Sequence, residues 1–303
     1  MQEIDLSVIV LNFNTKRITV DCLTSIFKYT KGISYEVIVV DNASTDGSGR
    51  MLRNFQFLIS NFQLIRNRKN LGFAAGNNVG IKKARGRYVL LLNSDTYLSG
   101  NSLKEMVEFM DEHPDVGVSS CRLANPDGTT QATGGFFPTL PRVFAWMFFL
   151  DDIPLISSLL KPVHPYSKSG FYDKDHEQDW ITGAFFMIRD KVIDQIGLLD
   201  EDYFMYMEDV DYCYRVRQKS WRVFYTTRTK ITHIGGASGG SENTIISELK
   251  NLKLFYKKHY PHWQGAILSV LMKVGVFLRA VFFGVLLGRR NHLKIYAKAF
   301  AIL

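Results

Sequence analysis

The sequence has few cysteines, and it lacks the motifs that mark several common classes of protein. Its three cysteines, Cys22, Cys121 and Cys213, are far apart in the chain and have none of the spacings of a zinc site or a disulfide framework. A reducing compartment is therefore expected. No basic segment precedes the first apolar run, so no signal peptide is predicted. The glycine-rich segments contain neither G-x-G-x-x-G nor Gly-Lys-Ser/Thr, which argues against a Rossmann-type oxidoreductase and a P-loop enzyme.

Acidic residues are absent from residues 250–303, which contain ten Lys or Arg residues. Residues 1–249 carry 27 cations and 29 anions, so the net charge of +8 belongs to the C-terminal segment. Within it, the aliphatic run 265–288 is long enough to span a bilayer, which needs about 20 apolar residues. Lys273 and Arg279 interrupt this run, and charges near the bilayer centre cost about 2.5–3.5 kcal/mol each.

A peripheral contact with an anionic membrane surface, made by amphipathic helices, is the favoured interpretation of this segment. The alternative is a pair of helices buried in the core of the protein. No nucleic-acid partner is expected, because the cations stand among aliphatic side chains and few aromatic residues are available for base stacking.

Apolar runs that end in polar residues alternate with segments of helical character in the first part of the chain. This alternation predicts an α/β fold with a parallel sheet covered on both faces. Each run ends in Asn or Asp, and the carboxyl ends of parallel strands form the usual ligand crevice. The predicted strands are 6–14, 35–44, 62–67 and 86–95, and the predicted helices are 15–30, 46–56, 75–84 and 102–112.

The pattern changes after residue 115, where turn-rich sequence leads into a long insert over 143–179. Regular patterns return over 179–190 and continue to about residue 236. The predicted domains are a catalytic domain over 1–245, with a donor half at about 1–115 and an acceptor half at about 116–245, and a basic, apolar helical tail over 246–303.

Two segments near the predicted strand ends have the chemistry of a nucleotide site. Asp41 stands at a strand end, where its carboxylate can accept the imide N–H of a pyrimidine, whereas residues 44–46 are also typical helix caps. The loop "NLGFAAGNNVGI" places Gly72 and Gly76 where the backbone can approach a nucleotide, and Asn77 and its neighbour could bond to it. A packing turn is the alternative for these glycines.

Carboxylates occur at two further positions where they could act on a phosphate or a hydroxyl. Asp95 follows a buried strand in "LLNSDT", and one or two carboxylates with substrate phosphates are the usual ligands of Mg²⁺ or Mn²⁺. Glu208 and Asp209 stand at an apparent helix start in "YMEDVDYCYR". One of these acids could be a general base, whereas the alternative is that the helix dipole stabilises acids at this position. His233 ends a strand before a glycine-rich segment, as a candidate metal ligand or a structural histidine.

Taken in order, six motifs resemble those of the family 2 glycosyltransferases with a GT-A fold, and the resemblance covers roughly residues 5–240. The implied fold is a Rossmann-like mixed sheet flanked by helices, here followed by amphipathic C-terminal helices. The most similar members are rhamnosyltransferase-like enzymes of bacterial surface polysaccharide synthesis. The motifs are "SVIVLNFN", "EVIVVDNASTDGS", "NLGFAAGNNVGI", "LLNSDT", "WITGAFFMIRD" and "GLLDEDYFMYMEDVDYCYR".

The resemblance also implies roles for individual residues. It makes Asp209 the catalytic base, and Asp95 and His233 the ligands of Mg²⁺ or Mn²⁺, with Asn93 in place of the first acid of the family's D-x-D motif. The implied donor-binding residues are Asn12, Asp41, Asn70, Gly72, Asn77, Asn93, Ser94 and Asp95. The implied acceptor-binding residues are Trp180, Thr182, Gly183 and Glu208.

The expected reaction is transfer of a sugar with inversion from a nucleotide-diphosphate donor to a hydroxyl of a polyprenyl-diphosphate-linked glycan. L-Rhamnose from dTDP-rhamnose is the favoured donor, and UDP-galactofuranose or UDP-glucose is the alternative. The enzyme is expected on the cytoplasmic face of the bacterial inner membrane. An alternative of another class is a non-catalytic, membrane-bound module that binds nucleotide sugars or glycans. The candidate base Asp209 argues against this alternative, because a protein that only binds has no use for a general base.

Overall fold

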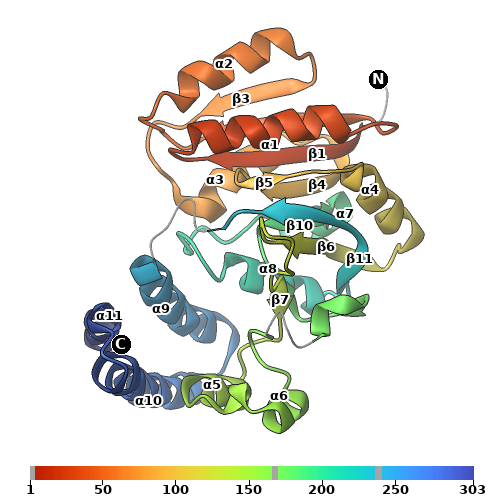
Figure 1. Cartoon of the computed structure of the whole chain (residues 1–303). Helices are drawn as coiled ribbons and strands as arrows, with labels where there is room; N and C mark the ends of the chain where they lie inside the picture. The colour runs from red at the N-terminus through yellow and green to blue at the C-terminus, as the bar shows by residue number, and fades with distance from the viewer. Residues whose placement is uncertain (1–3, 166–169, 236–240) are drawn as a thin grey trace. The chain divides into compact units, whose positions relative to one another are not determined.

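The chain forms two compact units, which are coloured by residue number in Figure 1. The computed structural model describes residues 4–165, 170–235 and 241–303. Unit 1 comprises residues 1–134 and 166–238, and unit 2 comprises residues 135–165 and 239–303. The sequence-based division near residue 245 placed the whole insert in the catalytic domain. In the structure, residues 135–165 instead form one unit with the C-terminal helices.

The first half of unit 1 is the predicted parallel sheet with helices between its strands. Its strands lie in the order β3-β2-β1-β4. They are β1 (Ile4–Asn12), β2 (Tyr35–Asp41), β3 (Phe62–Arg66) and β4 (Gly86–Asn93), and the helices are α1 (Lys16–Tyr29), α2 (Ser48–Leu58), α3 (Gly72–Ile81) and α4 (Ser102–Glu112). All eight predicted elements are confirmed. Helix α3 begins three residues earlier than predicted, and there the Asn70 side chain accepts the Gly72 N–H at 2.9 Å.

The strands of this half are apolar on both faces because helices cover both faces. Leu6, Val8 and Val10 of β1 belong to the main core cluster. The residue between them, Ile9, packs on the opposite face against Gly80 of α3, where an added Cβ would come within 2.6 Å of it. A strand buried on both faces has a continuous apolar run rather than an alternating pattern, and this is what the sequence of β1 shows.

The second half of unit 1 extends the sheet with mixed strand directions. Strand β10 (Phe185–Arg189) runs antiparallel to β4 and to β6 (Val116–Ala124), and β11 (Arg222–His233) runs parallel to β6. At the edge, β5 (Thr96–Tyr97) pairs antiparallel with the end of β11. The remaining elements of unit 1 are β8 (His176–Glu177), β9 (Trp180–Ile181), η3 (Phe171–Asp173), α7 (Asp190–Ile196) and α8 (Glu208–Gln218); the two-residue strand β7 (Gly134–Gly135) lies at the unit boundary.

Unit 2 is helical. The Tyr256 hydroxyl of its first C-terminal helix donates to the Pro138 carbonyl of the insert at 2.6 Å, and His164 pairs with Glu248 at 2.9 Å. The helices of the insert are α5 (Leu140–Met147), η1 (Leu150–Asp152) and α6 (Pro154–Leu160). The C-terminal helices are α9 (Ser241–His259), α10 (His262–Arg279), η4 (Ala280–Leu286) and α11 (Arg290–Ile302).

Candidate active site

The carboxyl ends of three adjacent parallel strands bring predicted donor-binding residues together. In the register of the sheet, Asn12 is the partner of Asp41, and Leu11 is the partner of Asn93. The sequence predicted this arrangement, because parallel strands all end at the same edge of the sheet. The edge is polar for this reason and not because of any single motif.

Asn12 is an internal connector of this edge. Its amide nitrogen donates to Asp41 Oδ1 at 3.0 Å and to Ser44 Oγ at 2.9 Å. Its amide oxygen accepts from the hydroxyls of Thr15 at 2.9 Å and Thr19 at 2.8 Å. These bonds use both protons and both lone pairs of the amide. In this structure the completely buried Asn12 therefore orients Asp41 and the following loop, rather than facing a ligand with an unused group.

Asp41 is completely buried and is held on both carboxylate oxygens. Oδ1 accepts from the Asn12 amide and from the Ser44 N–H, and Oδ2 accepts from the Arg66 guanidinium at 3.2 Å. Arg66, at the end of β3, is about half exposed and is the cationic partner that sequence reasoning missed. The sequence offered only one indication of this role, which is that Arg66 comes directly before Asn67, the last residue of the predicted strand 62–67. A buried carboxylate fixed on both oxygens is rigidly oriented at the sheet edge.

The glycine-rich loop is fixed by Asn42, which sequence reasoning did not single out. The Asn42 amide donates to Asn70 Oδ1 at 2.8 Å and to the Gly72 carbonyl at 3.0 Å. Its oxygen accepts from Asn67 at 3.0 Å and from the Leu71 N–H at 3.1 Å. The predicted donor residue Asn77 is also buried, and it donates to the Phe73 carbonyl at 3.0 Å. The loop is thus held in one conformation beside Asp41.

The predicted site glycines are positions of close internal packing. An added Cβ at Gly76 would come within 2.7 Å of Leu11 Cδ1. At Gly72, where φ is +82°, it would come within 2.3 Å of the Phe204 carbonyl oxygen. The Phe204 carbonyl also accepts the Phe73 N–H at 2.6 Å. Close packing, the alternative interpretation of these glycines, therefore accounts for both, and it joins the loop to the segment before α8.

Replacement of Gly72 by alanine is expected to destabilise the protein by about 2–5 kcal/mol. About 1–2 kcal/mol of this arises from a left-handed backbone and about 1–3 kcal/mol from overpacking against Phe204. Gly128→Ala is the matched control, because φ there is +85° but an added Cβ would meet no atom within 4 Å. Urea unfolding of both variants measures the difference. Equal losses would show that the contact with Phe204 imposes no constraint.

Asp95 and His233 lie side by side because β5 pairs with the end of β11. His233 is the register partner of Thr96, and its Nε2 lies 3.2 Å from Asp95 Oδ1. The Asn93 amide nitrogen lies 3.4 Å from the same Nε2. The neighbouring Ser94 hydroxyl is within 3.1 Å of the Thr15 hydroxyl. The sequence predicted these residues as one site, although Asp95 and His233 are far apart in the chain.

Gln131 fixes the tautomer of His233, and sequence reasoning did not identify it. Gln131 Nε2 donates to the His233 carbonyl at 2.7 Å and to Asn125 Oδ1 at 2.7 Å. The other atom of this amide, Oε1, is therefore an acceptor, and it lies 2.8 Å from His233 Nδ1. Nδ1 must then carry a proton, and Nε2 is the ring nitrogen that faces Asp95. An imidazole oriented in this way is typical of a metal ligand.

This arrangement fits a hard divalent cation with few protein ligands. Within the described parts of the chain, no three His, Cys, Asp or Glu side chains lie close enough to one another to hold a metal ion. Asp95 and His233 offer one carboxylate and one imidazole, with Asn93 beside them. Mg²⁺ and Mn²⁺ commonly take only one or two protein ligands and complete their shells with phosphate oxygens and water. The donor set suits such a cation.

Asp209, the predicted base, is connected to the same sheet edge through two backbone groups. Its Oδ2 accepts the Gly183 N–H at 3.0 Å. The next residue, Ala184, accepts the Asn93 N–H through its carbonyl at 3.1 Å. The carboxylate is partly exposed at the start of α8. The structure thus links Asp209 to the end of β4 through the adjacent residues Gly183 and Ala184.

Glu208, predicted as an acceptor-binding residue, is buried next to Asp209. Burial raises the pKa of Glu208 well above its usual range, and the Asp209 charge raises this pKa further. Of the two acids, Asp209 is the one that is partly open to solvent. The side chain of Glu208 packs inside unit 1 and does not form part of an open acceptor surface.

The entry to α8 is strained. Tyr206 and Met207 have φ values of +72° and +71°, and neither is a glycine. Two consecutive left-handed residues cost about 1–3 kcal/mol each, and such strain is concentrated at functional sites. The sequence gave no sign of it, because neither tyrosine nor methionine favours this conformation. The strain marks the segment that carries Asp209.

The other predicted acceptor residues form a short strand and turn beside Asp209. Trp180 is buried in β9, and the Thr182 N–H donates to the Thr133 carbonyl at 2.8 Å. An added Cβ at Gly183 would come within 2.8 Å of the Phe73 ring. Phe73 belongs to the glycine-rich loop, so this contact joins the predicted donor and acceptor segments inside unit 1.

A comparison with protein families identifies the chain. The model for glycosyl transferase family 2 matches residues 7–197, which include the three strand ends, the glycine-rich loop, Asp95 and Gly183. The chain belongs to glycosyl transferase family 2. It is therefore an enzyme that transfers a sugar from a nucleotide-linked donor, which confirms the resemblance inferred from the six motifs.

Two curated relatives are distant in sequence. The chain is 23% identical over 261 residues to an N-acetylglucosaminyl-diphospho-decaprenol L-rhamnosyltransferase of Mycobacterium tuberculosis, covering 80% of this chain and 81% of that protein. It is 26% identical over 231 residues to a low-salt glycan biosynthesis hexosyltransferase of Haloferax volcanii, covering 71% of this chain. The chain spans only 62% of that second relative's length.

A solved structure shows the fold. A mannosyltransferase of Pyrobaculum calidifontis, solved with GDP-Man and Mn²⁺, matches 100% of this chain and 75% of its own length, with a TM-score of 0.59 and 16% identity. This likeness supports the predicted GT-A fold, in which a mixed sheet is flanked by helices. The predicted α/β class is confirmed.

Proposed function

We propose that this glycosyltransferase transfers L-rhamnose from dTDP-rhamnose, with inversion, to a hydroxyl of a polyprenyl-diphosphate-linked glycan. One observation of the structure carries the reaction type: Asp209 is held by the Gly183 N–H, and the next residue is bonded to Asn93 beside the Asp95–His233 pair. The mycobacterial relative, aligned over most of both chains, supports the choice of sugar and of a lipid-linked acceptor. UDP-galactofuranose and UDP-glucose are the alternative donors.

In the proposed mechanism, Asp209 removes the proton of the acceptor hydroxyl as that hydroxyl attacks C1 of the sugar. The bond from C1 to the diphosphate breaks in the same displacement, and the nucleoside diphosphate leaves on the opposite face. The Gly183 N–H keeps the Asp209 carboxylate oriented. Because one carboxylate is sufficient, no covalent intermediate forms and the anomeric centre is inverted. The buried Glu208 has no nucleophilic role in this scheme.

The leaving diphosphate is proposed to lie at the Asp95–His233 pair. Asp95 and His233 would hold a Mg²⁺ or Mn²⁺ ion, and the bound ion would neutralise part of the negative charge that develops on the diphosphate. The solved relative that contains both GDP-Man and Mn²⁺ supports this use of a divalent ion. Asp41 and the loop fixed by Asn42 are proposed to contact the base and ribose, with Asn12 and Arg66 orienting Asp41.

Replacement of Gln131 by leucine is expected to weaken Mn²⁺ binding about 10–100-fold, the usual effect of losing a group that orients a metal ligand. Gln131→Leu removes the acceptor for the His233 Nδ1 proton, so both tautomers become accessible. Titration of Mn²⁺ into the protein, followed by electron paramagnetic resonance, measures the affinity without turnover. Gln131→Glu, which keeps an acceptor oxygen, should retain tighter binding. Unchanged affinity in both variants would contradict this role for Gln131.

The C-terminal helices are proposed to hold the enzyme as a peripheral protein on the cytoplasmic face of the membrane. Helix α10 and η4 together form a continuous helical segment, His262–Leu286, that is long enough and apolar enough to cross a bilayer, and only 22% of its most apolar 18-residue window is buried. Low burial argues against the alternative of a core helix pair. A lipid-linked acceptor would meet such an enzyme at the membrane surface.

A donor panel tests the proposed sugar. The purified full chain is incubated with Mn²⁺, a polyprenyl-diphosphate-linked N-acetylglucosamine acceptor and dTDP-rhamnose, UDP-galactofuranose or UDP-glucose in turn. Acceptor-dependent release of dTDP, well above release of UDP, is the expected result. Release of UDP alone would replace rhamnose by one of the alternative sugars. Tight donor binding without any release would favour the non-catalytic binding module.

A further inference from the structure

The insert 135–165 packs directly on the C-terminal helices, with which it forms one compact unit. An added Cβ at Gly275 of α10 would come within 2.6 Å of the Met147 side chain of α5. The Arg279 guanidinium lies 4.4 Å from the centre of the Phe149 ring and donates to the Trp146 carbonyl. A charge that interrupts the apolar segment in sequence is therefore turned toward the insert, where it is bonded.

The face of α10 opposite to this packing is apolar and exposed. Its buried positions are Leu268, Met272, Gly275 and Val276. Five of its six exposed large apolar residues recur at intervals of three or four, which places these five on one side of the helix. They are Trp263, Ile267, Val270, Val274 and Phe277, with Val270 63% exposed. An α-helix that is apolar on two sides and packed on only one has a second apolar face left to cover.

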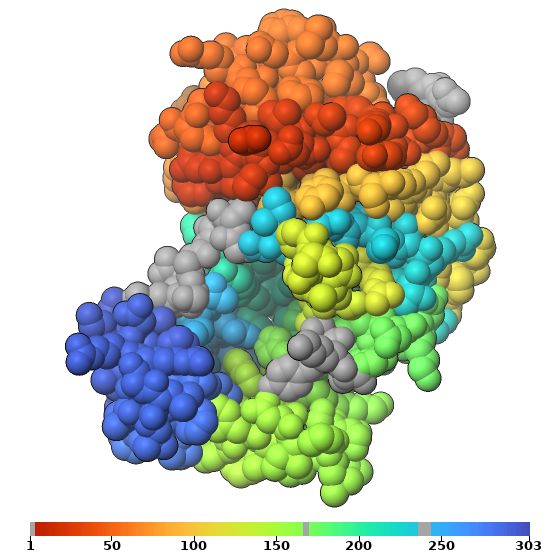
Figure 2. Space-filling model, in the orientation of Figure 1, coloured from red at the N-terminus to blue at the C-terminus, as the bar shows by residue number. Residues whose placement is uncertain are grey.

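Helix α6 of the insert presents a second apolar surface in the same unit. Leu155 and Leu159 are 71% and 74% exposed, and they are one turn apart on the same side of the helix. No residue of α6 is buried. In Figure 1, α5, α6 and α10 extend along one end of unit 2, and in Figure 2 the α6 segment lies at the molecular surface.

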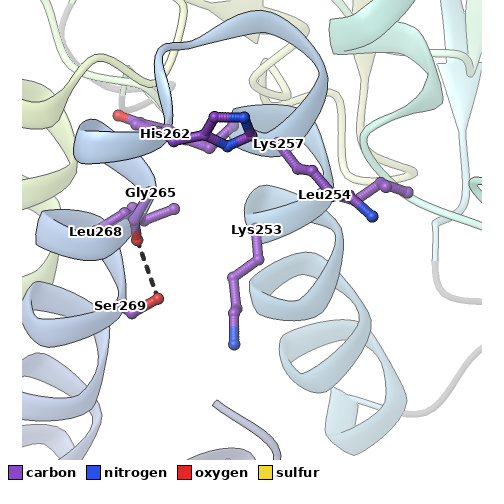
Figure 3. A pocket seen from close by; sticks show the side chains of 8 residues that line it. Lys253, Leu254, Lys257, His262, Gly265, Leu268 and Ser269 are labelled. Atoms are coloured by element: carbon purple, nitrogen blue, oxygen red, sulfur yellow. Dashed lines mark hydrogen bonds between the residues drawn. The ribbon is translucent and has the colours of Figure 1, made fainter.

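One cation borders the exposed apolar face of α10. Lys273 is exposed, and it follows Val270 by three residues and precedes Phe277 by four, so it lies along the edge of that face. Further cations lie on the other side of the helix. A groove between α9 and α10 is lined by Lys253 and Lys257 of α9 and by His262 and Ser269 of α10 (Figure 3). Lys257 is exposed, whereas Lys253 donates to the Leu303 carbonyl at 2.7 Å. Residues 250–303 contain no acid that could offset this charge. An exposed apolar face bordered by a cation, in a segment with a large excess of cations over acids, matches an anionic lipid bilayer, with acyl chains below the headgroup phosphates.

We infer that unit 2 as a whole docks on an anionic bilayer, with α6 of the insert as a second membrane-contacting element in addition to α10. The insert begins two residues after Thr133, whose carbonyl holds the Thr182 N–H of the predicted acceptor segment. Docking through the insert therefore ties the acceptor segment to the membrane surface by a very short piece of chain. This inference rests on the proposed use of a lipid-linked acceptor, and it adds the insert to the membrane contact.

Vesicle flotation of the full chain tests this inference. Vesicles of phosphatidylcholine alone are compared with vesicles that also contain about 30% phosphatidylglycerol, which is an anionic lipid. The expected result is flotation with the anionic vesicles that falls at least about tenfold in Leu155→Asp/Leu159→Asp. The matched control is Phe57→Asp/Leu58→Asp on α2 of unit 1, where the two side chains are 81% and 83% exposed. This control should float like the unmodified protein.

Trp263 provides a second readout. Its emission should shift to shorter wavelength and be quenched by brominated lipid on vesicle binding, and Trp263→Phe should remove that change. Flotation of Leu155→Asp/Leu159→Asp equal to that of the control would overturn the role of α6. An apolar face covered by a second copy of the chain, seen as a dimer by sedimentation with no flotation, would overturn the bilayer as the occupant.

The two proposals can fail separately. Nucleoside diphosphate release in detergent, measured without vesicles, reports the proposed function and the integrity of unit 1 in every variant. Retained release with unchanged flotation of Leu155→Asp/Leu159→Asp would sink the docking inference alone. Absent release in the unmodified protein, together with normal flotation that depends on Leu155 and Leu159, would sink the proposed function alone.

Discussion

Asp209→Asn is expected to lower the rate of sugar transfer about 10²–10⁴-fold, the range for loss of a general base, while donor affinity changes by no more than a few-fold. The amide keeps an oxygen that can accept the Gly183 N–H, so the geometry at the start of α8 is retained. It cannot take the proton of the acceptor hydroxyl. Single-turnover transfer and donor titration of the same preparation separate the two effects.

Asp194→Asn is the matched control for this variant. Asp194 is an exposed acid on α7 of unit 1, so the same change in charge is made away from the proposed centre. The control should keep its transfer rate. Near-normal turnover of Asp209→Asn would mean that another group is the base. Buried Glu208, with its raised pKa, would then be the first to test by Glu208→Gln.

Asp95→Ala is expected to lower transfer at fixed Mn²⁺ by about 10²–10³-fold, the range for loss of one group that stabilises developing charge. Asp95 is the only carboxylate of the proposed pair, and without it His233 would offer a single ring nitrogen. Excess Mn²⁺ should restore part of the activity, because the remaining ligand still binds weakly. Activity as a function of Mn²⁺ concentration measures the shift.

Chelation complements this variant. The unmodified enzyme should lose transfer in excess chelator and regain it with Mg²⁺ or Mn²⁺. Asp21→Ala, an exposed acid on α1, controls for the change in net charge and should behave like the unmodified protein. Full activity of the unmodified enzyme in chelator would leave Asp95 without a metal role and make it a direct sugar or structural contact.

The parallel half of the sheet could be predicted from sequence because its signals are local. Each β-branched run ends in a polar residue, as β1 does at Asn12, and a segment of helical character follows each run in the sequence. The meeting of Asp95 with His233 was predicted from the family motifs rather than from spacing. It depends on the pairing of β5 with β11, which no local pattern indicates.

The residues that sequence reasoning missed all act through long-range contacts. Asn42 and Gln131 are ordinary amides until the fold brings them to the glycine-rich loop and to His233. Arg66 pairs with Asp41 only because β3 lies next to β2. The union of the insert with the C-terminal helices likewise joins segments that are separated by residues 166–238 of unit 1, and neither segment carries a sequence signal for the other.

The stereochemistry of the product tests the central claim most directly. If Asp209 acts as a base in one displacement, the glycoside formed must have the anomeric configuration opposite to that of the donor sugar. The one-bond coupling constant between C1 and H1 of the purified product, measured by NMR, distinguishes the two configurations. An inverted centre is the predicted result. A retained centre would require two displacements or a front-face reaction, and it would contradict the proposed role of Asp209.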